Sequence, residues 1–129
     1  AGIKNYNTII TDLSLRGIGQ NDHFDLIIAD VPCSGSGTWA RTPEQLYYFE
    51  KYRIEKFVQL QKSILTNIVS SLKPGGYLLY ITCSVFKDEN EDNVQFLTKN
   101  FSLQLHEQII LKGYDMQADT MFAALLTKT

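Results

Sequence analysis

The chain has 129 residues, of which 44% are hydrophobic and 20% are charged, a mixture typical of one folded domain with its own core. The net charge of −2 and a sequence pI near 5.6 argue against a free-standing basic nucleic-acid-binding module. No apolar run reaches the roughly 20 residues that a membrane-spanning helix needs, and the first residues carry no signal-peptide pattern. We therefore expect a cytoplasmic protein whose cysteines stay reduced.

Two strands are predicted in the first part of the chain. Residues 7–11 form a short β-branched run that ends at Asp12, and we expect this run to be a strand. Residues 23–30 form a longer apolar run bounded by aspartates, which predicts a fully buried strand. A loop rich in glycine and serine follows the second of these strands.

Two helices are predicted in the middle of the chain. The first starts with Thr42 as its N-cap, Pro43 in the first turn and Gln45 at the reciprocal capping position. The second covers residues 53–72, where apolar side chains recur at steps of three and four residues. The Lys-Pro-Gly-Gly sequence at residues 73–76 ends this helix, because proline disfavours helix before it and glycine supplies turn conformations.

The remainder of the chain alternates strands with one more helix. Residues 77–82 predict a second buried strand, and the acidic residues of segment 88–91 open a helix at the positive end of its dipole. Residues 103–111 and 120–127 are the last two strand candidates. This alternation predicts an α/β fold with right-handed crossovers, and we expect residues 1–129 to form a single domain.

Two cysteines follow predicted strands and are the main candidates for chemistry. Cys33 lies in the sequence Asp-Val-Pro-Cys-Ser-Gly-Ser-Gly at residues 30–37, and Cys83 lies in Tyr-Ile-Thr-Cys-Ser at residues 80–84. The carboxyl ends of parallel strands border the ligand crevice in an open α/β sheet. Two thiols at one crevice would suit thiolate chemistry, whereas a free cysteine is more commonly a small buried hydrophobic residue.

Several other kinds of site do not fit the sequence. The Gly-Ser-Gly at residues 35–37 lacks the Lys-Ser/Thr ending of a phosphate-binding P-loop, and the chain has no Gly-x-Gly-x-x-Gly dinucleotide pattern. His23 and His106 have no ligand-like spacing to either cysteine. We therefore predict neither a nucleoside triphosphatase nor a metal site.

The order of the motifs resembles that of a known family. Residues 72–79 (Leu-Lys-Pro-Gly-Gly-Tyr-Leu-Leu) resemble the region before strand five of Rossmann-like methyltransferases. Together with residues 30–35 and 82–84, they resemble the RNA cytosine-C5 methyltransferase family of the Sun, Nop2 and Fmu type. Three further segments carry the same resemblance: residues 41–44, 60–65 and 89–91.

The resemblance implies a partial Rossmann-like sheet of the class I methyltransferase type, mainly parallel with an antiparallel last strand and flanked by helices. In that family, a glycine-rich loop after strand one and an acidic residue after strand two hold S-adenosylmethionine. Both would precede this chain, so we expect residues 1–129 to be the C-terminal part of the catalytic domain. The chain alone would then be inactive and would expose an apolar sheet edge that favours self-association.

The resemblance also implies roles for residues at the two cysteine motifs. Cys83 would add to carbon 6 of cytosine as the nucleophile, which makes carbon 5 electron-rich, and Cys33 would assist release of the product. Asp30 would hydrogen-bond the base and share the proton needed there. Loop amides and helix amino ends after each cysteine would lower the thiol pKa.

The implied cofactor is S-adenosylmethionine, and the implied partner is ribosomal or transfer RNA with an unstacked cytosine. Three residues are implied to line the cofactor: Asp12, which would contact the adenine amino group, Asp30 and Pro32. The residues implied to touch the RNA are Ser34, Gly35 and Arg41. For Asp12 and Asp30, an ordinary capping aspartate is the alternative. Trp39 and the aromatic residues 47–49 could stack on the RNA, and for Tyr47 and Phe49 the alternative is packing under the active-site loop.

Two rival functions remain open from the sequence. DNA cytosine-C5 methyltransferases also have a Pro-Cys after strand four, and Cys33 would be the nucleophile in that case. Those enzymes follow the cysteine with glutamine rather than Ser-Gly and have no counterpart of the Thr-Cys at residues 82–83. The second rival is a folded piece that binds neither cofactor nor RNA.

Overall fold

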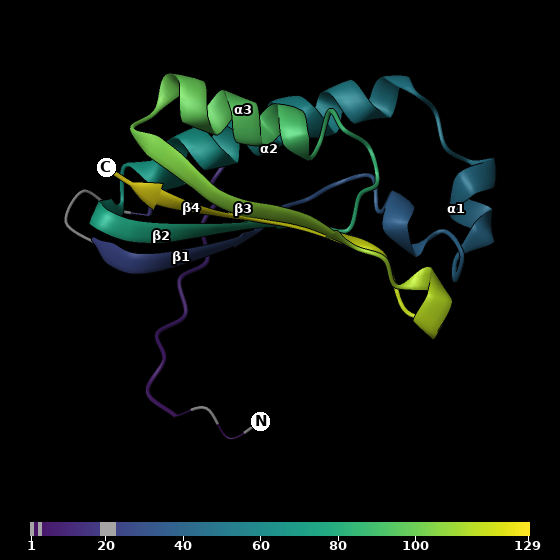
Figure 1. Cartoon of the computed structure of the whole chain (residues 1–129), viewed down its shortest axis with the longest axis horizontal. Coiled ribbons are helices and arrows are strands. Elements are labelled where there is room, and N and C mark those ends of the chain that lie inside the picture. Colours follow the sequence, from purple (N-terminus) through teal and green to yellow (C-terminus); the bar gives the residue numbers. More distant parts are fainter. Residues whose placement is uncertain (1, 3, 19–22) are drawn as a thin grey trace.

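The computed structural model describes residues 2, 4–18 and 23–129, and a four-stranded sheet in the order β1-β2-β4-β3 is its framework (Figure 1). The strands are β1 (Phe24–Asp30), β2 (Leu72–Thr82), β3 (Leu103–Leu111) and β4 (Met121–Lys128). The helices are α1 (Pro43–Tyr47), α2 (Tyr52–Val69) and α3 (Glu91–Asn100), with 3-10 turns η1 (Ser36–Thr38) and η2 (Tyr114–Met116).

The predicted α/β class is confirmed, and the pairing of the strands is mixed. β1 runs parallel to β2, whereas β4 runs antiparallel to both β2 and β3. β1, β2 and β3 therefore run in the same direction and only the last strand, β4, is reversed, which confirms the expected mainly parallel sheet with an antiparallel last strand. β3 and β4 are joined by a short connection through η2, and a short connection favours antiparallel neighbours.

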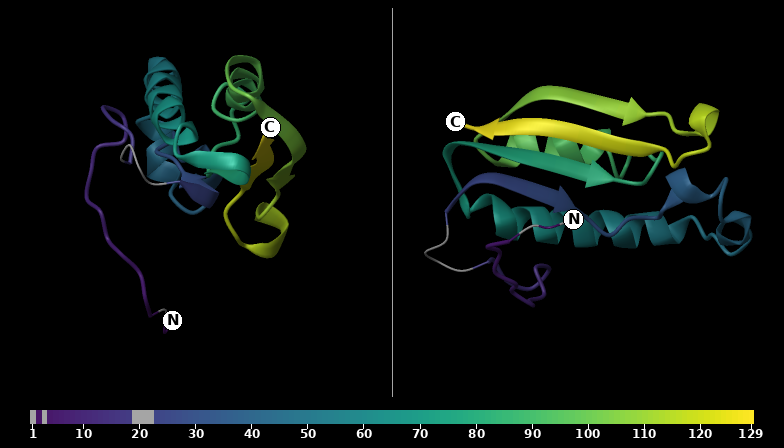
Figure 2. Two further views of the ribbon diagram at one scale, coloured as in Figure 1. Left: turned by 90° about the vertical axis from the view of Figure 1, so that its left-hand side faces the viewer. Right: turned by 90° about the horizontal axis from the view of Figure 1, so that it is seen from below.

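The two long helices cover one face of the sheet, and the other face is open among the described elements (Figure 2). Ile27 and Ala29 of β1 point into the core under α2, while Leu26 and Ile28 are 52% and 60% exposed. The prediction of a fully buried strand at residues 23–30 is therefore wrong. Alternate side chains face opposite sides of a strand, so a sheet with a single helical layer buries only every second residue.

The β-branched run at residues 7–11 is not a strand. It extends away from the sheet, and Ile9 and Ile10 are 60% and 95% exposed (Figure 1). Strand propensity reflects packing against neighbouring strands, and this run pairs with none of the described strands. A favourable local sequence therefore does not produce a strand at this position.

Two helix ends and one helix cap differ from the predictions. α2 ends at Val69, earlier than predicted, and β2 starts at Leu72, so residues 73–76 lie within the strand, where a register shift places Tyr77 opposite Leu26. α1 starts at Pro43 as predicted, but the Thr42 hydroxyl donates to the Thr38 carbonyl (3.1 Å) and does not cap the helix. α3 begins only at Glu91, after a turn that contains buried residues. No helix in the described part of the chain is long and apolar enough to cross a membrane.

The two faces of β1 predict very different costs for neighbouring substitutions. We expect Ile27→Ala to lower the free energy of unfolding by about 2–5 kcal/mol, because it leaves a cavity under the helices. The matched control Ile28→Ala removes a largely exposed side chain and should cost less than about 1 kcal/mol. Urea unfolding of both variants measures the difference, and equal losses would contradict the one-sided packing.

Candidate active site

Parallel pairing of β1 and β2 brings the two cysteine loops to the same edge of the sheet. Asp30, the last residue of β1, pairs with Ile81 near the end of β2. Cys33 and Cys83 follow directly, and their Sγ atoms lie 3.3 Å apart. Both thiols are free and partly buried. The structure therefore joins the two candidate nucleophiles into one dithiol site.

The two loops are also tied to each other by their backbones. The Gly37 N–H donates to the Cys83 carbonyl (2.8 Å), and the Gly37 carbonyl accepts from the Thr120 N–H (3.0 Å). A Cβ atom on Gly37 would lie 2.0 Å from the Thr120 carbonyl oxygen. Only glycine fits between the end of β2 and the start of β4, and this explains the second glycine of the Ser-Gly-Ser-Gly sequence.

The hydroxyls of three serines in the two cysteine loops, Ser34, Ser36 and Ser84, lie close together. Ser84 Oγ is 3.3 Å from both Ser34 Oγ and Ser36 Oγ, and the Val85 N–H donates to Ser36 Oγ (2.9 Å). Ser36 and Ser84 are buried, so these hydrogen bonds replace their contacts with water. The serine that follows each cysteine is thus part of the support of the site.

Sequence reasoning missed two residues of this support, Glu89 and Gln61. The sequence places Glu89 among the acidic residues that open a helix, but it lies before α3, is fully buried and accepts a hydrogen bond from the Ser34 N–H (2.9 Å). Gln61 is fully buried on α2 and donates to Glu89 (3.0 Å) and to the Pro32 carbonyl (2.9 Å). The available signal was the position of Gln61, three residues after Val58 and four before Leu65 on the apolar stripe of the helix.

The expectation that loop amides lower the pKa of both cysteines is wrong for Cys33. Burial, followed by the hydrogen bond with Cys83, raises the pKa of Cys33 from its ordinary value to about 12. The Gly35 amide acts in the expected direction, but its effect is smaller than that of burial. Cys33 therefore keeps its proton at neutral pH and can donate its S–H to the Cys83 sulfur.

A small cavity of about 180 Å³ opens beside Cys33. Its lining residues are Cys33, Ser34, Trp39, Gln45, Phe49, Arg53 and Phe57. The ring centroids of Trp39 and Phe49 lie 4.8 Å apart, and Phe49 stacks on Phe86 at 5.5 Å. These contacts favour the interpretation of Trp39 and Phe49 as packing residues.

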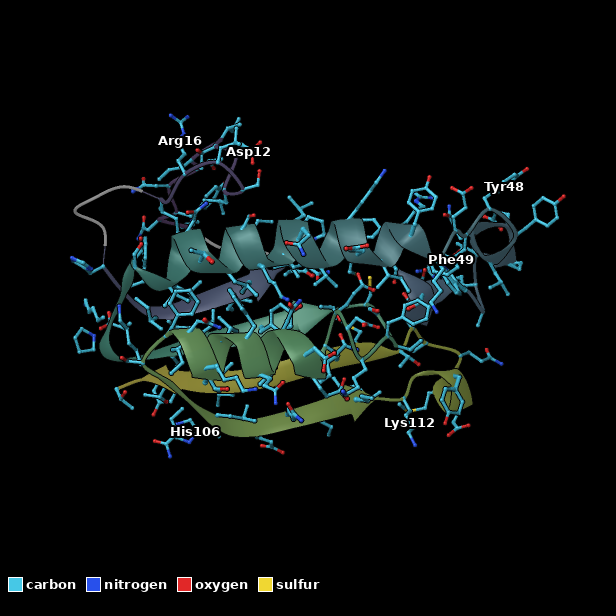
Figure 3. All side chains as sticks on the ribbon, turned by 90° about the horizontal axis from the view of Figure 1, so that it is seen from above. Asp12, Arg16, Tyr48, Phe49, His106 and Lys112 are labelled. Atoms are coloured by element: carbon cyan, nitrogen blue, oxygen red, sulfur yellow. The ribbon has the colours of Figure 1, made fainter. Side chains whose placement is uncertain are left out.

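Tyr47 is 83% exposed, and Figure 3 shows Tyr48 and Phe49 beyond the amino end of α2.

The other predicted site residues are distributed unevenly around the dithiol. Asp30 and Pro32 are exposed at the carboxyl end of β1, next to Cys33. Ser34 and Gly35 lie in the cysteine loop itself, where Gly35 has a φ of 69° that favours glycine. The described residues contain no group of three or more His, Cys, Asp or Glu side chains that could hold a metal ion.

Asp12 lies apart from this group, beside the carboxyl-terminal half of α2 (Figure 3). Its Oδ1 accepts from the Ser14 hydroxyl (2.6 Å) and the Ser14 N–H (2.9 Å), and these bonds lower the pKa of Asp12. The neighbouring Leu13 carbonyl accepts from Asn67 Nδ2 (2.8 Å) of α2. In this structure Asp12 therefore has the geometry of a turn-capping aspartate.

Arg41 is engaged in a bidentate ion pair with Asp119. Its Nη2 and Nε atoms lie 2.6 Å and 3.1 Å from the carboxylate oxygens. The pair joins the segment before α1 to the loop before β4, and it raises the pKa of Arg41 and lowers that of Asp119. An RNA phosphate would have to compete with this carboxylate for the guanidinium group.

Comparison with known proteins assigns the chain to a family. Residues 2–126 match the family described as 16S rRNA methyltransferase RsmB/F, and the chain belongs to this family. The Shewanella oneidensis ribosomal RNA small subunit methyltransferase B is 39% identical over 67% of this chain and 20% of that protein. The Shewanella loihica methyltransferase F is 34% identical over 67% of this chain and 18% of that protein. The chain thus spans about a fifth of the length of these curated relatives.

Solved structures show the same fold. PH0851 has a TM-score of 0.75 at 32% identity, over 81% of this chain and 26% of that protein. NSun6 from Pyrococcus horikoshii has a TM-score of 0.70 at 25% identity, over 79% of this chain and 29% of that protein. The N-methyltransferase NodS from Bradyrhizobium japonicum has a TM-score of 0.56 at 20% identity, over 92% of this chain and 52% of that protein, and shows the fold alone. The sheet is therefore part of a Rossmann-like methyltransferase fold.

The raised pKa of Cys33 predicts unequal reactivity of the two thiols. At about pH 8 we expect iodoacetamide to alkylate Cys83 well before Cys33, because only the thiolate reacts and Cys33 retains its proton. Peptide mapping by mass spectrometry measures the two rates. Urea-unfolded chain is the control, in which both cysteines should react at similar rates. Faster alkylation of Cys33 in the folded chain would contradict this prediction.

Proposed function

We propose that this chain is the C-terminal part of an enzyme that methylates carbon 5 of cytosine in ribosomal RNA through a covalent intermediate on Cys83. The contact of 3.3 Å between the two cysteine sulfurs at the carboxyl ends of parallel strands carries the proposal. Family membership supports ribosomal RNA as the substrate. Retention of a reduced dithiol fits the cytoplasm, where thiols stay reduced.

In the proposed reaction, Cys83 acts as a thiolate. Its sulfur forms a bond to carbon 6 of the ring, and the ring electrons move toward carbon 5 and nitrogen 3. Asp30, exposed at the end of β1, donates or shares the proton at nitrogen 3. After carbon 5 has been methylated, water acting as the base takes its proton, and nitrogen 3 returns its proton to Asp30. The electrons of the broken C–H bond re-form the double bond between carbons 5 and 6, and the bond from carbon 6 to the Cys83 sulfur breaks, so Cys83 leaves as a thiolate.

Cys33 assists this last step in the proposal. Its pKa is raised to about 12, so its S–H is available as a donor to the sulfur of Cys83. A hydrogen bond to the departing thiolate stabilises the negative charge that forms there. This arrangement favours Cys83 as the nucleophile over the DNA-type alternative, in which Cys33 attacks.

S-adenosylmethionine would supply the methyl group as a sulfonium. Asp30 and Pro32 at the end of β1 fit a ligand on one side of the site, while Asp12 lies elsewhere in this structure. We therefore propose that residues outside this chain complete the cofactor site. Membership of a methyltransferase family supports this choice of cofactor.

Two cysteine substitutions test the proposed roles in the longer enzyme. With a 16S rRNA transcript and the cofactor, Cys83→Ala should form no covalent RNA adduct, because the nucleophile is absent. Cys33→Ala should accumulate the adduct, because release is slowed. Denaturing gels reveal the adduct as a shifted protein band, and the double variant is the control. The reverse pattern would favour the DNA-type assignment.

Cofactor binding tests whether this chain supplies only a part of the cofactor site. We expect calorimetric titration of the chain alone with S-adenosylmethionine to give no tight binding, because the proposed cofactor site takes only Asp30 and Pro32 from this chain. A longer enzyme that contains this chain should bind. Tight binding by the chain alone would overturn the proposal that other residues complete the site.

A further inference from the structure

Glu89 is a buried carboxylate for which the proposed reaction has no role. It lies in the turn before α3 and has no exposed surface. A carboxylate taken out of water is unfavourable unless hydrogen bonds replace its hydration. Its Oε1 accepts from the Ser34 N–H (2.9 Å) and from Gln61 Nε2 (3.0 Å), and its Oε2 accepts from the Ser84 hydroxyl (2.5 Å).

Two of these three partners belong to the two cysteine loops. Ser34 directly follows Cys33, and Ser84 directly follows Cys83. The Ser84 oxygen also accepts from the Phe86 N–H (3.0 Å), so the hydroxyl proton is left free to point at Glu89. One carboxylate therefore links the residue after one thiol to the residue after the other.

The link is rigid because Glu89 is itself held from three elements. Its backbone carbonyl accepts from the Tyr80 hydroxyl of β2 (2.5 Å) and from Asn93 Nδ2 of α3 (3.2 Å). Gln61 of α2 binds the carboxylate and also the Pro32 carbonyl, one residue before Cys33. These buried hydrogen bonds connect α2, β2 and α3 through Glu89, and such a connected network favours a single geometry.

We propose that Glu89 is a positioning residue, whose carboxylate holds the loops of Cys33 and Cys83 so that the two sulfurs stay in contact. Its importance for catalysis rests on the proposed function, but the positioning itself does not. Glu89 touches neither sulfur and acts through Ser34 and Ser84.

The exchange of the dithiol with glutathione measures this positioning without RNA or cofactor. The thiols of Cys33 and Cys83 react with one glutathione disulfide to give one protein disulfide and two glutathione thiols. The equilibrium constant is the effective concentration of one thiol at the other. We expect Glu89→Gln to lower this effective concentration by about tenfold, because the NH2 group of the new amide cannot accept the hydrogen bond that the Ser84 hydroxyl donates.

Two further variants separate positioning from stability. Val94→Ala removes buried surface on α3 without touching either loop, so it should lower stability but leave the effective concentration unchanged. Ser84→Ala removes the hydrogen bond from the Cys83 loop to Glu89 and should also lower the effective concentration. This variant tests the positioning role if Glu89→Gln does not fold. An unchanged or higher value in the folded Glu89 or Ser84 variant would overturn the proposal.

In the longer enzyme, Glu89→Gln should lower kcat and leave the KM for RNA unchanged, since the residue does not contact the substrate in the proposed site. The two tests fail independently. If the enzyme forms no Cys83 adduct with RNA, the proposed function fails while the glutathione result still tests Glu89. If the adduct forms and the effective concentration is unchanged, only the positioning role fails.

Discussion

The parallel pairing of β1 and β2 is the constraint on which the site depends. Parallel strands end at the same edge of a sheet, so residues that follow the two strands meet without any further folding. Because Asp30 pairs with Ile81, the chain reaches Cys33 and Cys83 at nearly the same distance beyond the last paired residues. An antiparallel pairing would have placed the two cysteines at opposite ends of the sheet.

The pairing brings the loops together, but a set of polar contacts fixes their geometry. Gly37 lies between the ends of β2 and β4 at a distance that excludes any side chain, and it ties the first loop to the Cys83 carbonyl. The serine after each cysteine donates a hydrogen bond to the carboxylate of Glu89, Ser34 through its backbone N–H and Ser84 through its hydroxyl. Backbone hydrogen bonds of Gly37 and side-chain hydrogen bonds of Glu89 therefore both hold the two cysteine loops in place.

Much of the fold and part of the site followed from the sequence. The prediction of a strand at residues 103–111 is confirmed, and that of the last strand is correct to within one residue, because apolar residues recur in both segments and polar turn residues separate them. The strand predicted at residues 7–11 failed, since strand propensity without a partner strand is insufficient. The exposure of Leu26 and Ile28 was also missed, because an apolar run does not reveal whether one or both faces of a sheet are covered.

By itself, the sequence determined the α/β class, the position of each cysteine after a strand, and the resemblance to RNA cytosine-C5 methyltransferases, because these depend on local patterns and motif order. Only the tertiary structure decided that the two sulfurs touch, that the pKa of Cys33 rises, and that Arg41 pairs with Asp119. It also decided that Glu89 turns inward. The physical reason is that burial and hydrogen-bond partners come from segments distant in the chain, which no local pattern specifies.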